Sequence, residues 1–156
     1  MTVLAQPAVA SGQLRRPACL ATSSRPPGRQ DAIKLRHVIV IGKKVRNQPA
    51  PPHVVFEALI EPDRDPSRPW LELLDDEVRP VVLRAEVPLS VAWSSLWSER
   101  PDAAIQFDLP TGTRGGTDLC WTLLVDEPLP DDALIRQMRQ RVNKLINGNL
   151  RNTFGQ

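Results

Sequence analysis

Residues 131–150 read DDALIRQMRQRVNKLINGNL, the stretch with the clearest periodic pattern in the chain. Asp131 or Asp132, after Pro130, supplies an N-cap carboxylate for the unpaired amides of a first helical turn. A helix of this length spans about 30 Å, enough to cross one face of a five-stranded sheet. The apolar residues recur every three or four positions and so share one face of this helix: Leu134, Ile135, Met138, Val142, Leu145, Ile146 and Leu150.

The sequence before this helix predicts an antiparallel sheet. A run rich in valine and isoleucine and four segments with alternating apolar residues are the candidate strands: 35–41, 81–87, 91–97, 103–109 and 117–125. Short turns join the last four, which is typical of a β-meander with one buried and one solvated face. In the second candidate strand, the alternation predicts that Val81, Leu83, Ala85 and Val87 share the buried face.

One or two short helices are predicted between the first and second strands. Residues 53–60 follow a proline, as first helical turns prefer, and Phe56, Leu59 and Ile60 share one face. A loop over 61–69 leads to residues 70–74, for which we expect one or two further helical turns. The expected fold class is therefore α+β: an antiparallel β-meander gripping a long C-terminal α-helix, with one or two short helices after the first strand.

The composition is that of one globular domain with an N-terminal tail. Of the 156 residues, 41% are hydrophobic and 24% are charged. Residues 1–33 carry four arginines, four prolines and little apolar periodicity, and are predicted to be a disordered or processed tail. Because this segment is rich in arginine and serine, an organelle transit peptide is an alternative. Residues 34–156 form the predicted domain.

Charge and cysteine content narrow the classes of partner. The tail carries a net charge of +3, whereas the domain, with sixteen basic and seventeen acidic residues, carries −1. A near-neutral domain lacks the cationic surface that nucleic-acid binding requires, and no apolar run is long enough for a transmembrane segment. Cys19 and Cys120 make no disulfide framework, which favours a cytoplasmic protein. Frequent arginine, alanine and proline are typical of a bacterial source.

No pattern in the sequence identifies a reaction. The glycine-rich stretch 112–117 lacks the Gly-Lys-Ser/Thr ending of a phosphate-binding loop and is interpreted as a hairpin that needs positive φ. His37 and His53 have no partner at metal-ligand spacing, so neither a metal nor another cofactor is expected. The carboxylates at 75–77 are expected in a solvated loop rather than in an acid–base site. An enzyme is therefore less favoured than a binding protein.

The aromatic residues are the candidates for a binding site. Trp93 and Trp97 are four apart in a predicted strand, and Phe107 and Trp121 fall on the same apolar face of its neighbours. Four large rings beneath one amphipathic helix either close a core or line a hydrophobic pocket, and Met138 adapts to both arrangements. The basic stripe of the helix is either a solvated face or a surface for a protein partner: Arg136, Lys144 and Arg151.

The order of the elements carries a family resemblance. A strand is followed by Ala50-Pro51-Pro52-x-Val54-Val55-Phe56-x-Ala58-Leu59, then Pro69-Trp70, an antiparallel meander with Gly116-Thr117 near its last strand, and the long helix. Over residues 34–154 this layout resembles the START-like helix-grip superfamily (SRPBCC), which includes polyketide cyclase/dehydrase-like and lipid-transport-like proteins. The family usually has six or seven strands and five are counted here. Either a short strand lies near residues 77–79, or the sheet is reduced.

The resemblance implies that a small hydrophobic molecule, such as a lipid, sterol or polyketide, binds in a cavity between the sheet and the C-terminal helix. The residues expected to contact it are Trp70, near the mouth, with Trp93, Trp97, Phe107, Trp121, Met138 and Val142. One alternative is a regulatory or protein-interaction module with a filled core that uses the basic stripe. Another is a cyclase- or dehydratase-type enzyme, for which no catalytic residue can be assigned.

Overall fold

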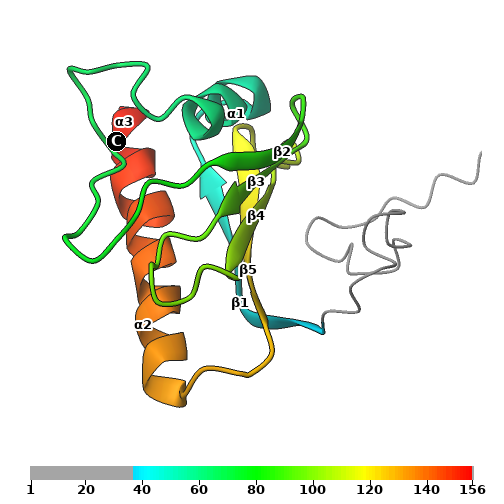
Figure 1. Cartoon of the computed structure of the whole chain (residues 1–156). Helices are drawn as coiled ribbons and strands as arrows, with labels where there is room; N and C mark the ends of the chain where they lie inside the picture. The colour runs from blue at the N-terminus through cyan, green and yellow to red at the C-terminus, as the bar shows by residue number, and fades with distance from the viewer. Residues whose placement is uncertain (1–36, 156) are drawn as a thin grey trace, which may run out of the picture.

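The computed structural model describes residues 37–155 and shows one antiparallel sheet packed against a C-terminal helix (Figure 1). The sheet has five strands in the order β1-β5-β4-β3-β2, so consecutive strands β2 to β5 form a meander and β1 pairs with β5. This confirms the predicted α+β class. The strands are β1 (Val38–Gln48), β2 (Val82–Glu86), β3 (Ser90–Ser94), β4 (Ala104–Asp108) and β5 (Thr117–Asp126).

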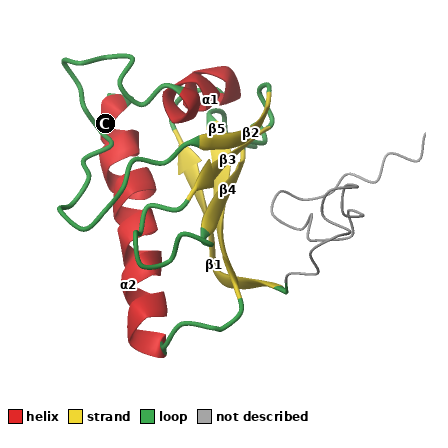
Figure 2. Ribbon diagram, viewed as in Figure 1, coloured by secondary structure: helices red, strands yellow, loops and turns green. Residues whose placement is uncertain are grey.

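Helix α1 (Pro52–Ile60) follows β1, with proline at its first position as predicted. The C-terminal helix begins with α2 (Asp132–Asn143) and continues through the π-helical segment η2 (Lys144–Leu150) into α3 (Arg151–Thr153). Asp131 is the N-cap, and its Oδ1 accepts a hydrogen bond from the Leu134 amide at 2.7 Å. Figure 2 shows these three segments as one continuous helix lying along a face of the sheet.

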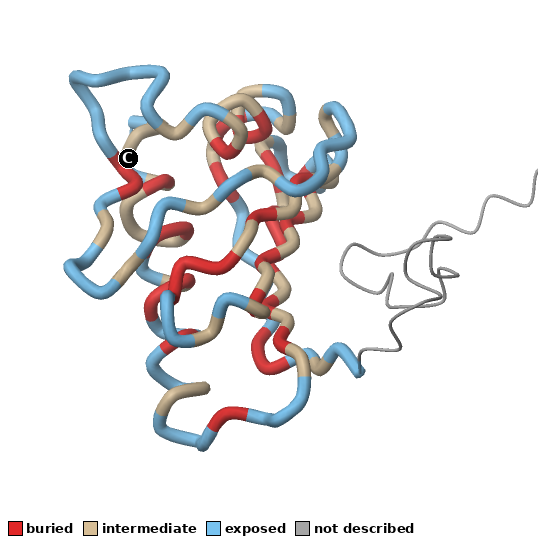
Figure 3. The backbone as a smooth tube through the Cα atoms, viewed as in Figure 1, coloured by how far each residue is buried: buried red, intermediate tan, exposed pale blue. Residues whose placement is uncertain are grey.

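The core lies between this helix and the sheet (Figure 3). Alternate residues of β5 are buried, including Leu119, Leu123 and Val125, each 0% exposed. They belong to one hydrophobic cluster with the helical residues that the sequence places on the apolar face, of which Met138, Val142, Leu145, Ile146 and Leu150 are fully buried. The predicted register of the helix is confirmed.

The glycine-rich turn before β5 adopts the conformation predicted for it. Gly115 and Gly116 have φ angles of 89° and 69°, which residues with a Cβ rarely adopt. A Cβ on Gly116 would collide with the carbonyl oxygen of Gln48 at the end of β1. This close approach lets the Thr117 hydroxyl donate to the Ala50 carbonyl oxygen at 2.8 Å, joining the start of β5 to the start of α1.

Two predictions about the chain between α1 and β3 are wrong. Residues 70–74 form no helix, because Trp70 and Leu71 are buried in an irregular segment that is held by tertiary contacts. In β2, the pairing with β3 shifts between Val82 and Arg84, which changes the residues that face the core. Val82 is therefore the residue packed against the core, whereas Val81, Leu83 and Val87 are 61–73% exposed and Ala85 is also exposed.

Other boundaries also differ from prediction. Strand β1 continues seven residues beyond the predicted end at Ile41 to Gln48, because it pairs with nearly all of β5. Strand β3 ends at Ser94, before Trp97, because the Ser95 hydroxyl accepts from the Trp97 amide and donates to the Trp97 carbonyl. Near residues 77–79 the structure has a single β-bridge, between Glu77 and Trp97, and no full strand.

The N-terminal tail, the cysteines and the possibility of a membrane-spanning helix are also subjects of prediction. The predicted tail, residues 1–33 with Cys19, lies outside the described residues. Cys120 is disulfide-bonded, whereas the cysteine count predicts no disulfide framework. Among residues 37–155, no helix is both long and apolar enough to cross a membrane.

Candidate functional site: an aromatic pair between two clefts

All seven predicted ligand-binding residues are buried in the core cluster. The structure brings three of them into direct ring contact. Trp70 and Trp93 are stacked with centroids 5.8 Å apart and an interplanar angle of 21°. Trp93 meets Phe107 edge-on, at 4.9 Å and 75°. Phe107 is in turn the register partner of Trp121 on β5. The sheet thus lines up rings from neighbouring strands, as the alternation predicts.

Local structure fixes the orientation of the stacked pair. The last carbonyls of a helix have no partner within the helix, and the Trp93 Nε1–H donates to one of them, Leu59 O in α1, at 2.9 Å. The Trp70 carbonyl oxygen accepts from the Asn149 side chain in η2 at 3.1 Å. The pair is therefore tied to α1 on one side and to the C-terminal helix on the other.

Two surface clefts lead to this pair, one on each side of the loop that follows α1. The first has a volume of about 620 Å³ and lies between the end of α1 and β2, with Trp93 in its wall. The second, of about 470 Å³, lies between α1 and the C-terminus of the chain, with Trp70 and Phe154 in its wall. Both are bordered by Glu61, Pro62 and Arg64.

The loop between the clefts is held by two ion pairs, Arg64–Glu57 and Arg79–Asp63. The four side chains are 46–71% exposed. Exposed ion pairs contribute about 0–1 kcal/mol each, so these charges fix the loop only weakly. They place polar groups at the rim, above walls formed by apolar residues such as Leu59, Val82 and Trp93.

The other predicted residues lie away from these two clefts. Trp121 lines a separate cleft of about 340 Å³ between β1 and α2. Trp97, Met138 and Val142 are buried in the core and line none of the three clefts. Of the seven predicted residues, Trp70 and Trp93 line these two clefts, and a ligand role for all seven stays a prediction.

The basic stripe of the C-terminal helix is not one open surface. Arg136 and Lys144 are exposed, as predicted. Arg151 is half-buried, and its guanidinium donates to the Asn47 carbonyl oxygen of β1 at 3.0 Å. A role of these three residues in binding a protein partner stays a prediction.

Sequence reasoning missed a buried ion pair beside the site. Glu77, expected in a solvated loop, pairs with Arg141 of α2, and their side chains are 2% and 9% exposed. The two residues are 64 positions apart, so no local pattern could have joined them. The only available signal was a basic residue at the flank of the apolar helix face.

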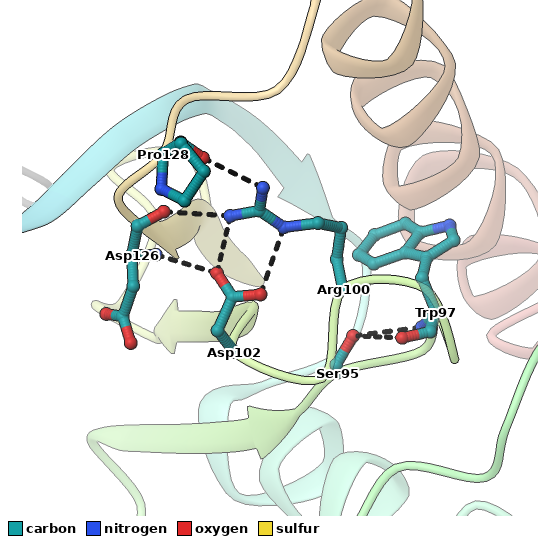
Figure 4. A network of polar contacts seen from close by, with 6 residues as sticks. All are labelled: Ser95, Trp97, Arg100, Asp102, Asp126 and Pro128. Atoms are coloured by element: carbon teal, nitrogen blue, oxygen red, sulfur yellow. Dashed lines mark hydrogen bonds and ion pairs between the residues drawn. The ribbon is translucent and has the colours of Figure 1, made fainter.

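A second polar network lies at the other end of the meander (Figure 4). The Arg100 guanidinium binds both carboxylate oxygens of Asp102 and donates to the carbonyl oxygens of Asp126 and Pro128 at 2.8 Å each. Burial acts to raise the pKa of Asp102. Hydrogen bonds from Arg100 and the Asp126 amide outweigh it and hold that pKa below its ordinary value. This network joins the β3–β4 connection to the end of β5 and has a structural role.

The described residues contain no cluster of three or more histidine, cysteine or carboxylate side chains that could hold a metal ion. No protein-family profile and no curated protein sequence matches the chain.

Two solved structures share the fold. CalU16 from Micromonospora echinospora is 17% identical, with a TM-score of 0.52 over 72% of this chain and 81% of its own. SA2116 from Staphylococcus aureus, a protein of unknown function, is 7% identical, with a TM-score of 0.50 over 74% of this chain and 91% of its own. At these identities the likeness is one of fold, and it supports the helix-grip arrangement of five antiparallel strands and a C-terminal helix.

Proposed function

We propose that this protein binds a small hydrophobic molecule, such as a lipid, sterol or polyketide, against the stacked Trp70–Trp93 pair. The observation that carries the proposal is that each ring of this pair lines a different cleft, on either side of one loop. A ligand that displaces the loop over residues 61–68 would reach both rings at once. The cleft volumes, about 620 and 470 Å³, fall within the range of about 300–1,000 Å³ that is usual for small-molecule sites.

The chemistry of the walls favours an apolar ligand. Leu59, Ile60, Val82 and Trp93 line the larger cleft. At its rim Arg79 pairs with Asp63 and Arg64 pairs with Glu57, whereas Glu61 is in neither ion pair. Such a site offers apolar surface below and water-exposed charges above. It suits a molecule with an apolar body, with Glu61 as the one rim carboxylate of the larger cleft that is outside the two ion pairs.

The proposal is tested by titrating the protein with a fatty acid, a sterol and an aromatic polyketide-like compound while recording tryptophan fluorescence. We expect a saturable change at one equivalent of ligand, below any micelle concentration. Trp93→Leu keeps the wall apolar but alters its shape, and should weaken binding by about 1–3 kcal/mol. Leu96→Val, at a core position that is 0% exposed and lines neither cleft, is the matched control. The absence of a saturable signal with all three compounds, or equal weakening in both variants, would contradict the proposal.

A second candidate function is protein binding at the edge of the sheet. Strand β2 is an edge strand, and it and its flanking turns expose Val81, Leu83, Val87 and Leu89 to 56–73%. Exposed apolar edge strands are usual sites of strand addition by a partner. Leu83→Lys should abolish such binding and leave the fluorescence titration unchanged, which separates this function from the first.

A further inference from the structure

A third cleft, between β1 and α2, collects positive charge. It has a volume of about 340 Å³ and lies at the edge of the sheet opposite β2, so it is separate from the proposed hydrophobic site. Its walls contain four basic residues, two amides, one tryptophan and no carboxylate: Lys43, Lys44, Arg136, Arg139, Gln140, Asn143 and Trp121.

The secondary structure accounts for this convergence. Lys44 is the register partner of Trp121, so both lie on the face of the sheet that the helix covers. Arg136, Arg139 and Asn143 are spaced by three and four residues and therefore lie on one side of α2. Lys43 also lines the cleft. Its charge acts on Asp108 as well, where burial raises the pKa and Lys43 offsets part of that rise.

Gly42 brings the two elements close enough to form the cleft. A Cβ at this position would lie 2.8 Å from Arg139 Cγ and 3.1 Å from Trp121 Cζ3. The aliphatic stem of Arg139 and the indole ring of Trp121 therefore both pack over the bare backbone of Gly42. Any side chain there would displace the arginine stem from β1.

The charges of the cleft lack partners in the described part of the chain. The four ion pairs there are Arg64–Glu57, Arg79–Asp63, Arg100–Asp102 and Arg141–Glu77, and none involves Lys44, Arg136 or Arg139. The Nε1–H of Trp121 is buried and has no hydrogen-bond acceptor. That donor is buried, so it is the convergence of Lys44, Arg136 and Arg139 in a cleft without a carboxylate that points to an anion as the missing partner.

We propose that this cleft binds the dianionic phosphate group of a small molecule. Lys44, Arg136 and Arg139 provide the positive charge, and guanidinium groups match the geometry of phosphate oxygens. The cleft volume, about 340 Å³, is near the lower end of small-molecule sites. The site therefore suits a phosphate with a small attached group, either free in solution or at the head of a lipid.

The test uses the full-length protein and isothermal titration with inorganic phosphate and phenyl phosphate, with benzyl alcohol as the neutral control. We expect both phosphates to bind, more weakly as salt is added, and the indole N–H resonance that Trp121→Phe removes to shift on binding. Lys44→Gln and Arg136→Gln should each weaken binding by about three- to tenfold. Lys144→Gln, which neutralises an exposed cation of the same helix outside the cleft, is the matched control and should bind normally.

Vesicles of phosphatidylcholine with and without phosphatidic acid distinguish the source of the phosphate. Binding only to vesicles that contain phosphatidic acid, with loss in Lys44→Gln, supports the site and assigns it to a lipid headgroup. Binding of the soluble phosphates alone assigns it to a free small molecule. If neither source binds, or if Lys144→Gln weakens binding as much as Lys44→Gln and Arg136→Gln do, the proposal is overturned.

Discussion

The guanidinium of Arg141 is bound by both carboxylate oxygens of Glu77, with Nε–Oε1 and Nη2–Oε2 distances of 2.5 and 2.8 Å. Arg141 Nη2 also donates to the Glu72 carbonyl oxygen, and Glu77 Oε2 accepts from the Leu74 amide at 2.9 Å. The irregular segment from Trp70 to Glu77 is thereby fastened to α2 through polar contacts. Because the segment carries Trp70, this pair also fixes one ring of the candidate site.

Removing one partner of this pair should strongly destabilise the fold. Glu77→Gln leaves the Arg141 charge buried without its counter-charge, and breaking a buried pair in this way costs about 3–5 kcal/mol. Urea denaturation of the variant measures the loss. Glu99→Gln, at an exposed position, is the control and should change the free energy of unfolding by less than about 0.5 kcal/mol. Equal stabilities of the two variants would show that the pair is not held as described.

The double variant Glu77→Gln/Arg141→Met provides a second test. It removes both charges, so it should recover part of the loss seen in Glu77→Gln. A double variant that is less stable than Glu77→Gln alone would mean that the Arg141 contact with the Glu72 carbonyl contributes more than its charge pairing with Glu77.

The Arg100–Asp102 network should make the free energy of unfolding depend on pH in the acidic range. Because the pKa of Asp102 is lowered in the folded protein, the ionised carboxylate stabilises the fold at pH values above the unfolded pKa of about 3.9. This stabilisation is lost as the pH falls through the lower folded value. In urea denaturation, wild type should therefore be more stable than Asp102→Asn at neutral pH, and the difference should shrink below about pH 4. A difference that stays constant to lower pH would contradict this assignment.

Asp108 should show the opposite dependence. Burial raises the pKa of this half-buried carboxyl, although a hydrogen bond from Gln106 and the charge of Lys43 act against it. The ionised form is therefore unfavourable in the fold, and stability should decrease as the pH rises above about 4. Asp108→Asn should stabilise the protein at neutral pH by up to about 1 kcal/mol, since water screens a half-exposed group. A destabilised variant at pH 7 would contradict the sign of this shift.

The parts of the fold that could be predicted from the sequence are those with local signals. The apolar spacing from Leu134 to Leu150 determines the register of the helix, and Asp131 determines its start. The alternation in β4 and β5 places Ile105, Phe107, Leu119 and Trp121 on the buried face. The positive φ angles of Gly115 and Gly116 in the turn before β5 could also be predicted, because residues with a Cβ rarely adopt them.

Other features depend on contacts between distant residues and could not be predicted. The apolar residues 70–74 resemble a helical turn, but Trp70 stacks on Trp93, and Arg141 binds the Glu72 carbonyl instead. The alternation in β2 fails because the bulge between Val82 and Arg84 depends on pairing with β3. The larger cleft arises where α1, β2 and the loop between them meet, and no short pattern encodes that meeting.

The register of the C-terminal helix can be tested by comparing a buried position with an exposed one. Val142 is 1% exposed in the centre of the apolar stripe, whereas Arg136 is exposed. Val142→Asp places a carboxylate in the core without a partner, at a cost of at least several kcal/mol, comparable with the total stability of about 5–15 kcal/mol of most domains. We expect this variant to be unfolded. Arg136→Ala should change stability by less than about 0.5 kcal/mol. Thermal melts followed by circular dichroism compare them, and equal midpoints would mean that the helix is turned so that Val142 does not face the sheet.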